Sequence, residues 1–439
     1  MKALPFACLH PVPELAAEVA ALPYDVFSRE EAAAAVAGRP RSFLNIDRPE
    51  TQFEPGHDMY APEVYARAAA LLEEQVAAGV YVEEGAPAYY IYELAQGGRA
   101  QTGIVACCPI DDFGNGTIRR HELTRPDKER DRIEHIRALS AQTGPIFLSY
   151  RDTDELNALV AGVTGERGTG GAAGGAGAAG GTTGGQAPLF DFTDGEGCRQ
   201  RVWQIADAPG MAAVEAAFDA VPCAYIADGH HRTASAVKVG QQRRAEAQAA
   251  GTYTGREPFN FVMGVLFPQS QLDILAYNRV VADRRGMDAA ALVRAVCAAG
   301  FAAEPAAGPV VPEAAGIVGM YAAGQWWRLA VRPEVAAAAA AESPVAALDI
   351  SILQDRVLAP VLGIEDPRTD PRIAFVGGVR GTAELERRAG GAAGAGVAFS
   401  MYPTGIGQLF DVADAGLLMP PKSTWFEPKL RSGLFIHRI

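Results

Sequence analysis

The chain lacks the features that would place it in several common classes of protein. It has 39 basic and 52 acidic residues, a formal net charge of −13, which argues against a general nucleic-acid binder because such proteins need a basic surface. Its six cysteines include no C-x-x-C spacing, so no zinc site or disulfide framework is expected. No apolar run has the length of a membrane helix or a signal peptide. These absences predict a cytoplasmic protein with no nucleic-acid and no membrane partner, of unspecified oligomeric state.

An ordinary phosphate-binding loop is also missing. Residues 165–187 are rich in Gly, Ala and Thr and contain a formal G-x-G-x-x-G at 175–180. No strand leads into this tract and no helix leaves it, so we interpret it as a flexible loop. Residues 375–381 (F-V-G-G-V-R-G) read as a strand and turn before a helix, but they lack the Lys-Ser/Thr pair of a P-loop. An ordinary P-loop kinase is therefore disfavoured.

What the chain does have is enough apolar sequence for two or three domains, with 49% hydrophobic residues among 439. Short apolar strands alternate with helical runs, which predicts a mixed α/β fold. Local expectations include a capped helix at 28–37, a strand at 42–46 and a charged helix at 127–142. The expected segments are an N-terminal α/β region (1–164), the flexible loop (165–187), a motif-bearing region (188–285) and a C-terminal α/β region (286–439).

The most informative stretch is Y-I-A-D-G-H-H-R-T-A-S-A-V at 225–237. It predicts a buried strand at 224–227, a turn at 228–232 and a long helix at 233–250. Gly229 permits a tight turn, and the unpaired N–H groups at a helix start stabilise an anion. Arg232 adds a planar fork, and His230 and His231 can donate protons near neutral pH. Adjacent histidines diverge, so no metal site is assigned; the competing interpretation is a polar turn in which Asp228 caps the helix.

The motif I-A-D-G-H-H-R-T-A-S-A resembles the signature of the ParB/sulfiredoxin-like superfamily. Sulfiredoxins have Cys where this chain has His230, so sulfinic-acid repair is not implied. Over nearly its full length the chain is similar to the DUF1015 family. The matching segments are 22–31 (L-P-Y-D-V-F-S-R-E-E), 121–132 (H-E-L-T-R-P-D-K-E-R-D-R), 144–150 (G-P-I-F-L-S-Y), the D-G-H-H-R turn, 348–353 (L-D-I-S-I-L) and 419–429 (M-P-P-K-S-T-W-F-E-P-K).

This resemblance implies an α/β (α+β mixed) fold with a ParB/sulfiredoxin-like core, related to free serine kinases. It also implies a small-molecule phosphotransferase that phosphorylates free L-serine, with pyrophosphate or a nucleotide as donor and Mg²⁺ as cofactor. The alternatives are a ParB-like nucleotide-binding regulator and a phosphohydrolase or nuclease.

Candidate residues for phosphoryl transfer follow from the matched segments. Catalytic roles are expected for Asp228, His230 and His231, with Asp228 favoured as general base over Asp25 and Glu122. The expected phosphate-binding residues are Gly229, His230, His231, Arg232, Lys128, Arg132, Lys422, Ser423 and Thr424. The remaining polar candidates in these segments are Tyr24, Asp25, His121, Glu122 and Thr124. The competing interpretation of the Lys128–Arg132 pair is a solvated helix face, and that of residues 422–424 is a C-terminal strand with a solvated lysine.

Overall fold

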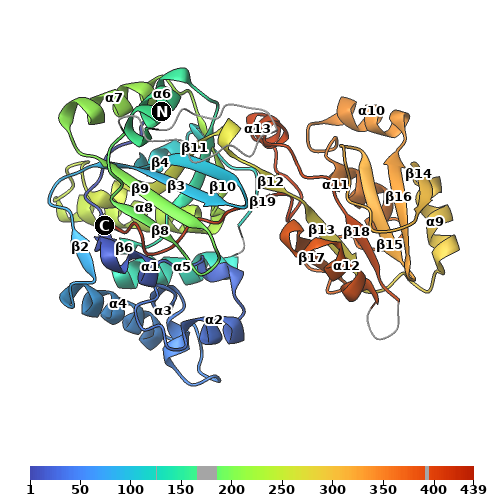
Figure 1. Ribbon diagram of the computed structural model, residues 1–439, viewed down its shortest axis with the longest axis horizontal. Coiled ribbons are helices and arrows are strands. Elements are labelled where there is room, and N and C mark those ends of the chain that lie inside the picture. The colour runs from blue at the N-terminus through green and yellow to red at the C-terminus, as the bar shows by residue number, and fades with distance from the viewer. Residues whose placement is uncertain (125, 166–184, 391–394) are drawn as a thin grey trace. The chain divides into compact units, whose positions relative to one another are not determined.

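The protein is described by a computed structural model that covers residues 1–124, 126–165, 185–390 and 395–439 (Figure 1). The chain forms two compact units. The first contains residues 1–120, 124–272 and 428–439, and the second contains residues 121–123 and 273–427. The expected mixed α/β class is confirmed, whereas most of the glycine-rich tract expected to be a loop lies outside the described residues.

The first unit is organised around a mixed sheet with strand order β5-β10-β7-β11-β4-β3-β9-β8. Neighbours β5 and β10 are parallel, as are β7 and β11, and the other pairs are antiparallel. Its strands are β3 (Tyr89–Gln96), β4 (Arg99–Pro109), β5 (Ile118–Arg119), β7 (Ile146–Tyr150), β8 (Phe190–Thr193), β9 (Arg199–Ile205), β10 (Ala224–Asp228) and β11 (Phe261–Pro268). These strands come from both sides of the 165–187 tract, so a single sheet includes residues from the regions 1–164 and 188–285.

Helices pack around this sheet, and two short strand pairs complete the unit (Figure 1). The helices are α1 (Ala16–Val19), α2 (Arg29–Val36), α3 (Leu44–Asp47), α4 (Pro62–Ala77), α5 (Pro126–Leu139), α6 (Asp154–Thr164), α7 (Ala208–Asp219) and α8 (His230–Ala250). The paired strands are β1 (Leu9–Pro11) with β2 (Tyr81–Glu83), and β6 (Ala141–Gln142) with β20 (His437–Arg438).

Two local expectations in this unit have opposite outcomes. The predicted cap of α2 is confirmed, because Ser28 and Glu31 form a reciprocal capping box. The predicted strand at 42–46 is wrong, since these residues enter α3 instead. A short apolar run does not distinguish a strand from a buried helical turn by its periodicity.

The strands β7 and β10 are buried along almost their whole length, which is typical of strands covered on both faces. Ile226 and Leu148, opposite each other in these strands, belong to one apolar cluster with Phe218 of α7 and Val239 of α8. Burial of such side chains stabilises the fold by about 1.5–3 kcal/mol each. The buried β10 therefore places its last residue, Asp228, at a fixed edge of the core.

The second unit is built on an antiparallel sheet with strand order β14-β16-β15-β18-β13-β17. Its strands are β13 (Tyr277–Val281), β14 (Phe301–Ala306), β15 (Ile317–Ala322), β16 (Gln325–Val331), β17 (Ile373–Gly377) and β18 (Val397–Ser400), with β12 (Ile274–Leu275) paired to β19 (Trp425–Phe426). Its helices are α9 (Ala289–Ala298), α10 (Pro333–Glu342), α11 (Asp349–Leu353), α12 (Gly381–Gly390) and α13 (Ile406–Asp414).

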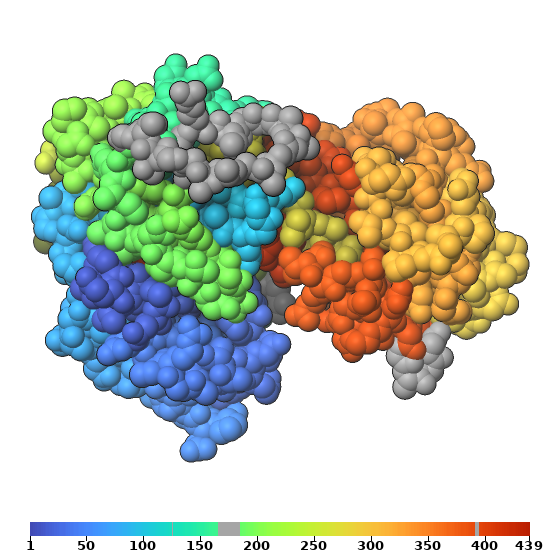
Figure 2. All heavy atoms as spheres, in the orientation of Figure 1, coloured from blue at the N-terminus to red at the C-terminus, as the bar shows by residue number. Residues whose placement is uncertain are grey.

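Two of these helices differ in how much of their surface is buried. Helix α12 contributes Leu385 to an apolar cluster with Val280 and Val376 of the sheet, which confirms the strand, turn and helix expected from residue 375 onward. Alanine-rich α10 has no buried residue, and its atoms appear on the surface in the space-filling view (Figure 2). Along the described residues, no helix combines the length and apolarity needed to cross a membrane.

Close packing of α8 gives a first testable prediction. A Cβ atom at Gly240 would overlap the carbonyl oxygen of Phe259, so Gly240→Ala should lower the free energy of unfolding by about 1–3 kcal/mol. Gly162 on α6 has no neighbour within 4 Å of its Cβ position, and Gly162→Ala should stabilise by about 0.5–1 kcal/mol. Urea unfolding of the two variants measures both effects. Equal unfolding midpoints for Gly240→Ala and Gly162→Ala would contradict the close packing of α8 at Gly240.

Candidate functional site

The D-G-H-H-R motif forms the predicted strand, turn and helix. Asp228 ends β10, Gly229 adopts the left-handed conformation with φ 88°, and α8 begins at His230. The helix therefore starts three residues earlier than the sequence suggested, and the first amide bonded inside it is that of Thr233, 2.9 Å from the oxygen of Gly229. The N–H groups of the first turn have no intrahelical acceptor, as at any helix start.

Asp228 is the residue before the N-cap of α8, which is Gly229. Its Oδ1 accepts the Gly229 N–H at 2.7 Å, and its Oδ2 accepts the Lys429 ammonium at 2.7 Å. Burial alone would raise the pKa of Asp228, but the positive charges of Lys429 and Arg232 and the Gly229 N–H hold it well below its usual range. A carboxylate with so low a pKa is a poor proton acceptor, which argues against the favoured role of Asp228 as general base.

The guanidinium of Arg232 lies in a space that two glycines leave open. Its Nη1 donates to the Pro145 oxygen at 3.0 Å. A Cβ atom at Gly144 would stand 3.0 Å from this Nη1, and one at Gly229 would stand 3.4 Å from Nε. Within the described residues Arg232 has no ion-pair partner. The hydrogen bond to Pro145 uses one of the five N–H donors of the guanidinium. The other donors are available to an anion.

Arg132, also predicted to bind phosphate, is already paired with protein carboxylates. It is 6% exposed, lies 2.9 Å from Asp131 and 3.9 Å from Asp47, and stacks 4.0 Å above the ring of Tyr24. Burial raises the pKa of Tyr24, so this phenol stays neutral. Lys128 is half-buried one turn earlier on α5. The i,i+4 pair on α5 thus consists of one neutralised arginine and one lysine.

A small pocket lies within the first unit, beside the turn. Its volume is about 30 Å³, which is room for roughly two water molecules. Its polar side chains include Tyr24, Asp47, Arg132, Thr143, Arg232 and Ser432. Asp47 is 4% exposed and accepts the Thr143 hydroxyl at 3.2 Å. Segments 22–31, 121–132 and 144–150 and the D-G-H-H-R turn, which the sequence singled out separately, therefore meet at one pocket.

Glu129 joins α5 to α8, and Thr124 binds Glu129. The Thr124 hydroxyl donates to the Glu129 carboxylate at 2.8 Å, and the Ser235 hydroxyl donates to the Glu129 carbonyl at 3.0 Å. The ammonium of Lys238 also binds the Glu129 carboxylate. Asp25, by contrast, is exposed next to Tyr24. Glu129 therefore links the two helices, and the Thr124 hydroxyl is used to hold its carboxylate.

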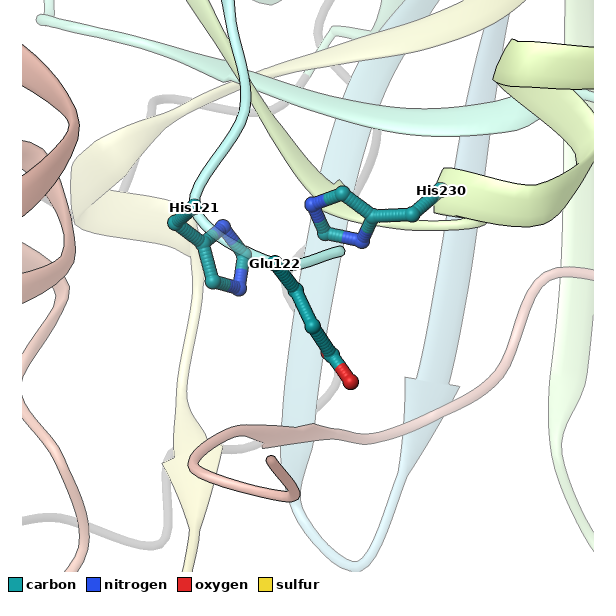
Figure 3. A group of neighbouring side chains, drawn as sticks. All are labelled: His121, Glu122 and His230. Atoms are coloured by element: carbon teal, nitrogen blue, oxygen red, sulfur yellow. The ribbon is translucent and has the colours of Figure 1, made fainter. Parts of the chain in front are cut away.

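The remaining candidates belong to the second unit. The Thr424 hydroxyl lies 3.4 Å from Nε2 of His121, so residues about 300 positions apart meet. The Ser423 hydroxyl donates to the Pro420 oxygen and is thus already used. Figure 3 shows the side chains of His121 and Glu122, which belong to the second unit. It also shows the side chain of His230, which belongs to the first turn of α8 in the first unit.

Sequence reasoning missed Arg279, which supports the P-P-K-S-T segment. Arg279 is 3% exposed, and its Nη2 donates to the Lys422 oxygen at 3.2 Å. Lys422 has a left-handed backbone with φ 58°, a conformation that costs a non-glycine residue about 1 kcal/mol or more. Burial lowers the pKa of Arg279 to about 10. A single arginine in a strand without a charged motif gives no sequence signal of such a role.

Comparison with known proteins identifies the family. The family model described as "Protein of unknown function (DUF1015)" matches residues 3–351. The chain belongs to the DUF1015 family. Comparison with curated proteins gives no match.

Three solved structures to which this DUF1015 protein is similar have low sequence identity. C-terminally truncated SbnI from Staphylococcus aureus is 12% identical with TM-score 0.35, over 74% of this chain and 82% of that one. A free serine kinase in complex with AMP is 12% identical with TM-score 0.31, over 73% and 86%. A conserved hypothetical protein from Pyrococcus furiosus is 11% identical with TM-score 0.31, over 74% and 93%. The function must therefore be argued from the residues of the site.

The ion pair at the turn of this DUF1015 protein gives a second prediction. Lys429→Gln should lower the free energy of unfolding at pH 7 by about 1–2 kcal/mol, between the values for surface and buried pairs. Because the folded protein lowers the pKa of Asp228, this stabilisation is complete above the usual aspartate pKa and is lost as pH falls toward the folded-state value. The difference between variant and wild type should therefore shrink below about pH 4.

Urea unfolding at several pH values measures this difference. Lys2→Gln is the control, because Lys2 pairs with Asp219 on an exposed surface and should change stability by less than about 1 kcal/mol. A difference for Lys429→Gln that stays constant down to pH 2 would show that the loss comes from packing rather than from the ion pair.

Proposed function

We propose that this DUF1015 protein is a small-molecule phosphotransferase that phosphorylates the hydroxyl group of free L-serine. The donor would be pyrophosphate or a nucleotide, with Mg²⁺ bound to its phosphates. The observation that carries the proposal is the start of α8, where left-handed Gly229 begins the helix and the positive charges of Arg232 and Lys429 both act on the adjacent Asp228.

Phosphoryl transfer is catalysed mainly by positioning and by neutralisation of charge. In the proposed site, the N–H groups of His230, His231 and Arg232 would bind donor phosphate oxygens, favoured by the positive end of the helix dipole. Gly229 lets these oxygens approach the backbone. His231 is half-buried on the same turn and would donate a further hydrogen bond from its imidazole.

The role of Asp228 changes in this proposal. Its low pKa and its bond to Lys429 suit a residue that holds the ammonium in place beside the phosphates. The proton of the serine hydroxyl would then pass to another group, and Asp25 and Glu122 remain the candidate carboxylates. Both oxygens of Asp228 are already bonded within the protein, so this carboxylate does not fit Mg²⁺. The ion would be held by the donor phosphates and water, as Mg²⁺ commonly is.

The second unit offers further candidates for phosphate binding. Lys422 and Thr424 stay in the proposal, because Arg279 supports the backbone between them and His121 lies next to Thr424. Ser423 is less suited, since its hydroxyl is bonded to Pro420. Lys128 remains a candidate on α5, and Arg132 would act on the ligand only together with its carboxylate partners.

The third prediction concerns the activity itself. Purified protein with L-serine and Mg²⁺ should form phosphoserine with pyrophosphate, ATP or ADP as donor, detected by ³¹P NMR. His231→Ala should lower kcat/KM by about 100-fold or more, because a positioned imidazole contributes roughly 10²–10⁴ to such reactions. His57→Ala is the matched control, since His57 lies outside the turn and stacks on Phe53; this variant should keep wild-type activity.

Other outcomes distinguish the alternatives. Binding of a nucleotide without turnover would favour a ParB-like regulator, and release of phosphate without transfer to serine would favour a phosphohydrolase or nuclease. The proposal is wrong if no donor gives phosphoserine. If His231→Ala and Arg232→Ala both fold and bind phosphate ligands as the wild type does, the D-G-H-H-R turn is only a structural turn.

A further inference from the structure

The pocket beside the turn has an unusual balance of charge. Arg132 is neutralised most closely by Asp131, at 2.9 Å, and only at 3.9 Å by Asp47. Asp131 does not line the pocket. The charged groups of the pocket walls are then the guanidinium of Arg232 and the carboxylate of Asp47, whose only ion-pair contact among the described residues is the long one to Arg132. A ligand that matches both must carry one negative and one positive charge.

The size of the pocket narrows the ligand further. A volume of about 30 Å³, room for roughly two water molecules, excludes a nucleotide, so a ligand here must be a small head group that displaces these waters. A free phosphate would be small enough, but its negative charge would face the buried carboxylate of Asp47, and like charges at close range are costly in a protein interior. The helix start, whose N–H groups are all donors, is the better place for phosphate.

We propose that this pocket binds the zwitterionic head group of an α-amino acid, which is the acceptor of the phosphoryl group. The assignment deepens the proposed function and rests on it. The α-carboxylate binds the guanidinium of Arg232, whose planar fork suits a carboxylate. The α-ammonium binds Asp47, whose Oδ1 already accepts the Thr143 hydroxyl at 3.2 Å. The side-chain hydroxyl of the acceptor then points out of the pocket.

The glycines around Arg232 support this assignment. Gly144 leaves room for the guanidinium, since a Cβ there would lie 3.0 Å from Nη1 and 3.2 Å from the Ser432 hydroxyl. Among the residues that the structure describes, the Arg232 side chain makes a single hydrogen bond, which Nη1 donates to the backbone carbonyl oxygen of Pro145 at 3.0 Å. Within the described residues no carboxylate lies within 4 Å of this guanidinium, since Asp228, whose pKa Arg232 helps to lower, binds Lys429 instead. The acceptor would supply a directly bound carboxylate.

The fourth prediction concerns how much each charge of the ligand contributes to its binding by the wild-type protein. Isothermal titration calorimetry compares L-serine with 3-hydroxypropionate, which lacks the ammonium group, and with ethanolamine, which lacks the carboxylate. Both should bind at least tenfold more weakly than L-serine. Equal binding of L-serine and 3-hydroxypropionate would overturn the assignment, as would displacement of L-serine by inorganic phosphate at equal concentration.

A variant of Asp47 tests the assignment of the ammonium site. Asp47→Asn should weaken L-serine binding about tenfold or more and leave 3-hydroxypropionate binding within about twofold, so that the preference between them is lost. A purely structural role would weaken both ligands alike and would overturn the proposal. Asp152→Asn is the matched control; Asp152 binds the Ser270 backbone at an exposed site and should not alter binding. If Asp47→Asn does not fold, the wild-type comparison alone decides.

The proposed function and the pocket assignment fail in different ways. Phosphoserine formation with an unchanged KM for L-serine in Asp47→Asn would overturn the pocket assignment and leave the phosphotransferase in place. Binding of L-serine that requires both of its charges, without product from any donor, would support the pocket and overturn the phosphotransferase.

Discussion

The ion pair between Asp228 and Lys429 is the interaction on which the site depends. It ties residues 428–439 to the end of β10, next to the left-handed Gly229 that starts α8. The same terminal segment is held by the buried pair of Arg431 with Asp194 at 2.7 Å, and by reciprocal backbone bonds of Ser432 to Ala21. The turn is therefore bonded to a segment about 200 residues away in sequence, and both belong to the same compact unit.

Charge pairing distinguishes Arg232 from the buried arginines of the first unit. The buried guanidiniums of Arg48, Arg132 and Arg431 each bind a carboxylate within 3 Å, as expected because an unpaired charge is costly to bury. Arg232, half-buried in the same unit, binds only a backbone carbonyl within the described part of the chain. An anionic ligand would complete its coordination, which is why the donor and acceptor sites are both proposed beside this residue.

Much of the local structure around the turn follows from the sequence. The buried strand, the glycine and the long helix were all predicted, because an apolar run, a turn residue and a helix with its caps each have a local signal. The partner of Asp228 was not predicted, even though Lys429 lies in a segment that the sequence singled out. Long-range ion pairs depend on the tertiary fold, and no local pattern in one sequence encodes them. Asp47 was missed for the same reason, since it follows the segment 42–46, which was expected to be a strand, and only the tertiary fold brings it to the pocket.

The most direct test of the central claim is a crystal structure of the protein with pyrophosphate. The account predicts the phosphate groups at the first turn of α8, within hydrogen-bonding distance of the N–H groups of His230 and His231, with Asp228 still bound to Lys429. Pyrophosphate bound elsewhere while this turn stays free at saturating concentration would contradict the account.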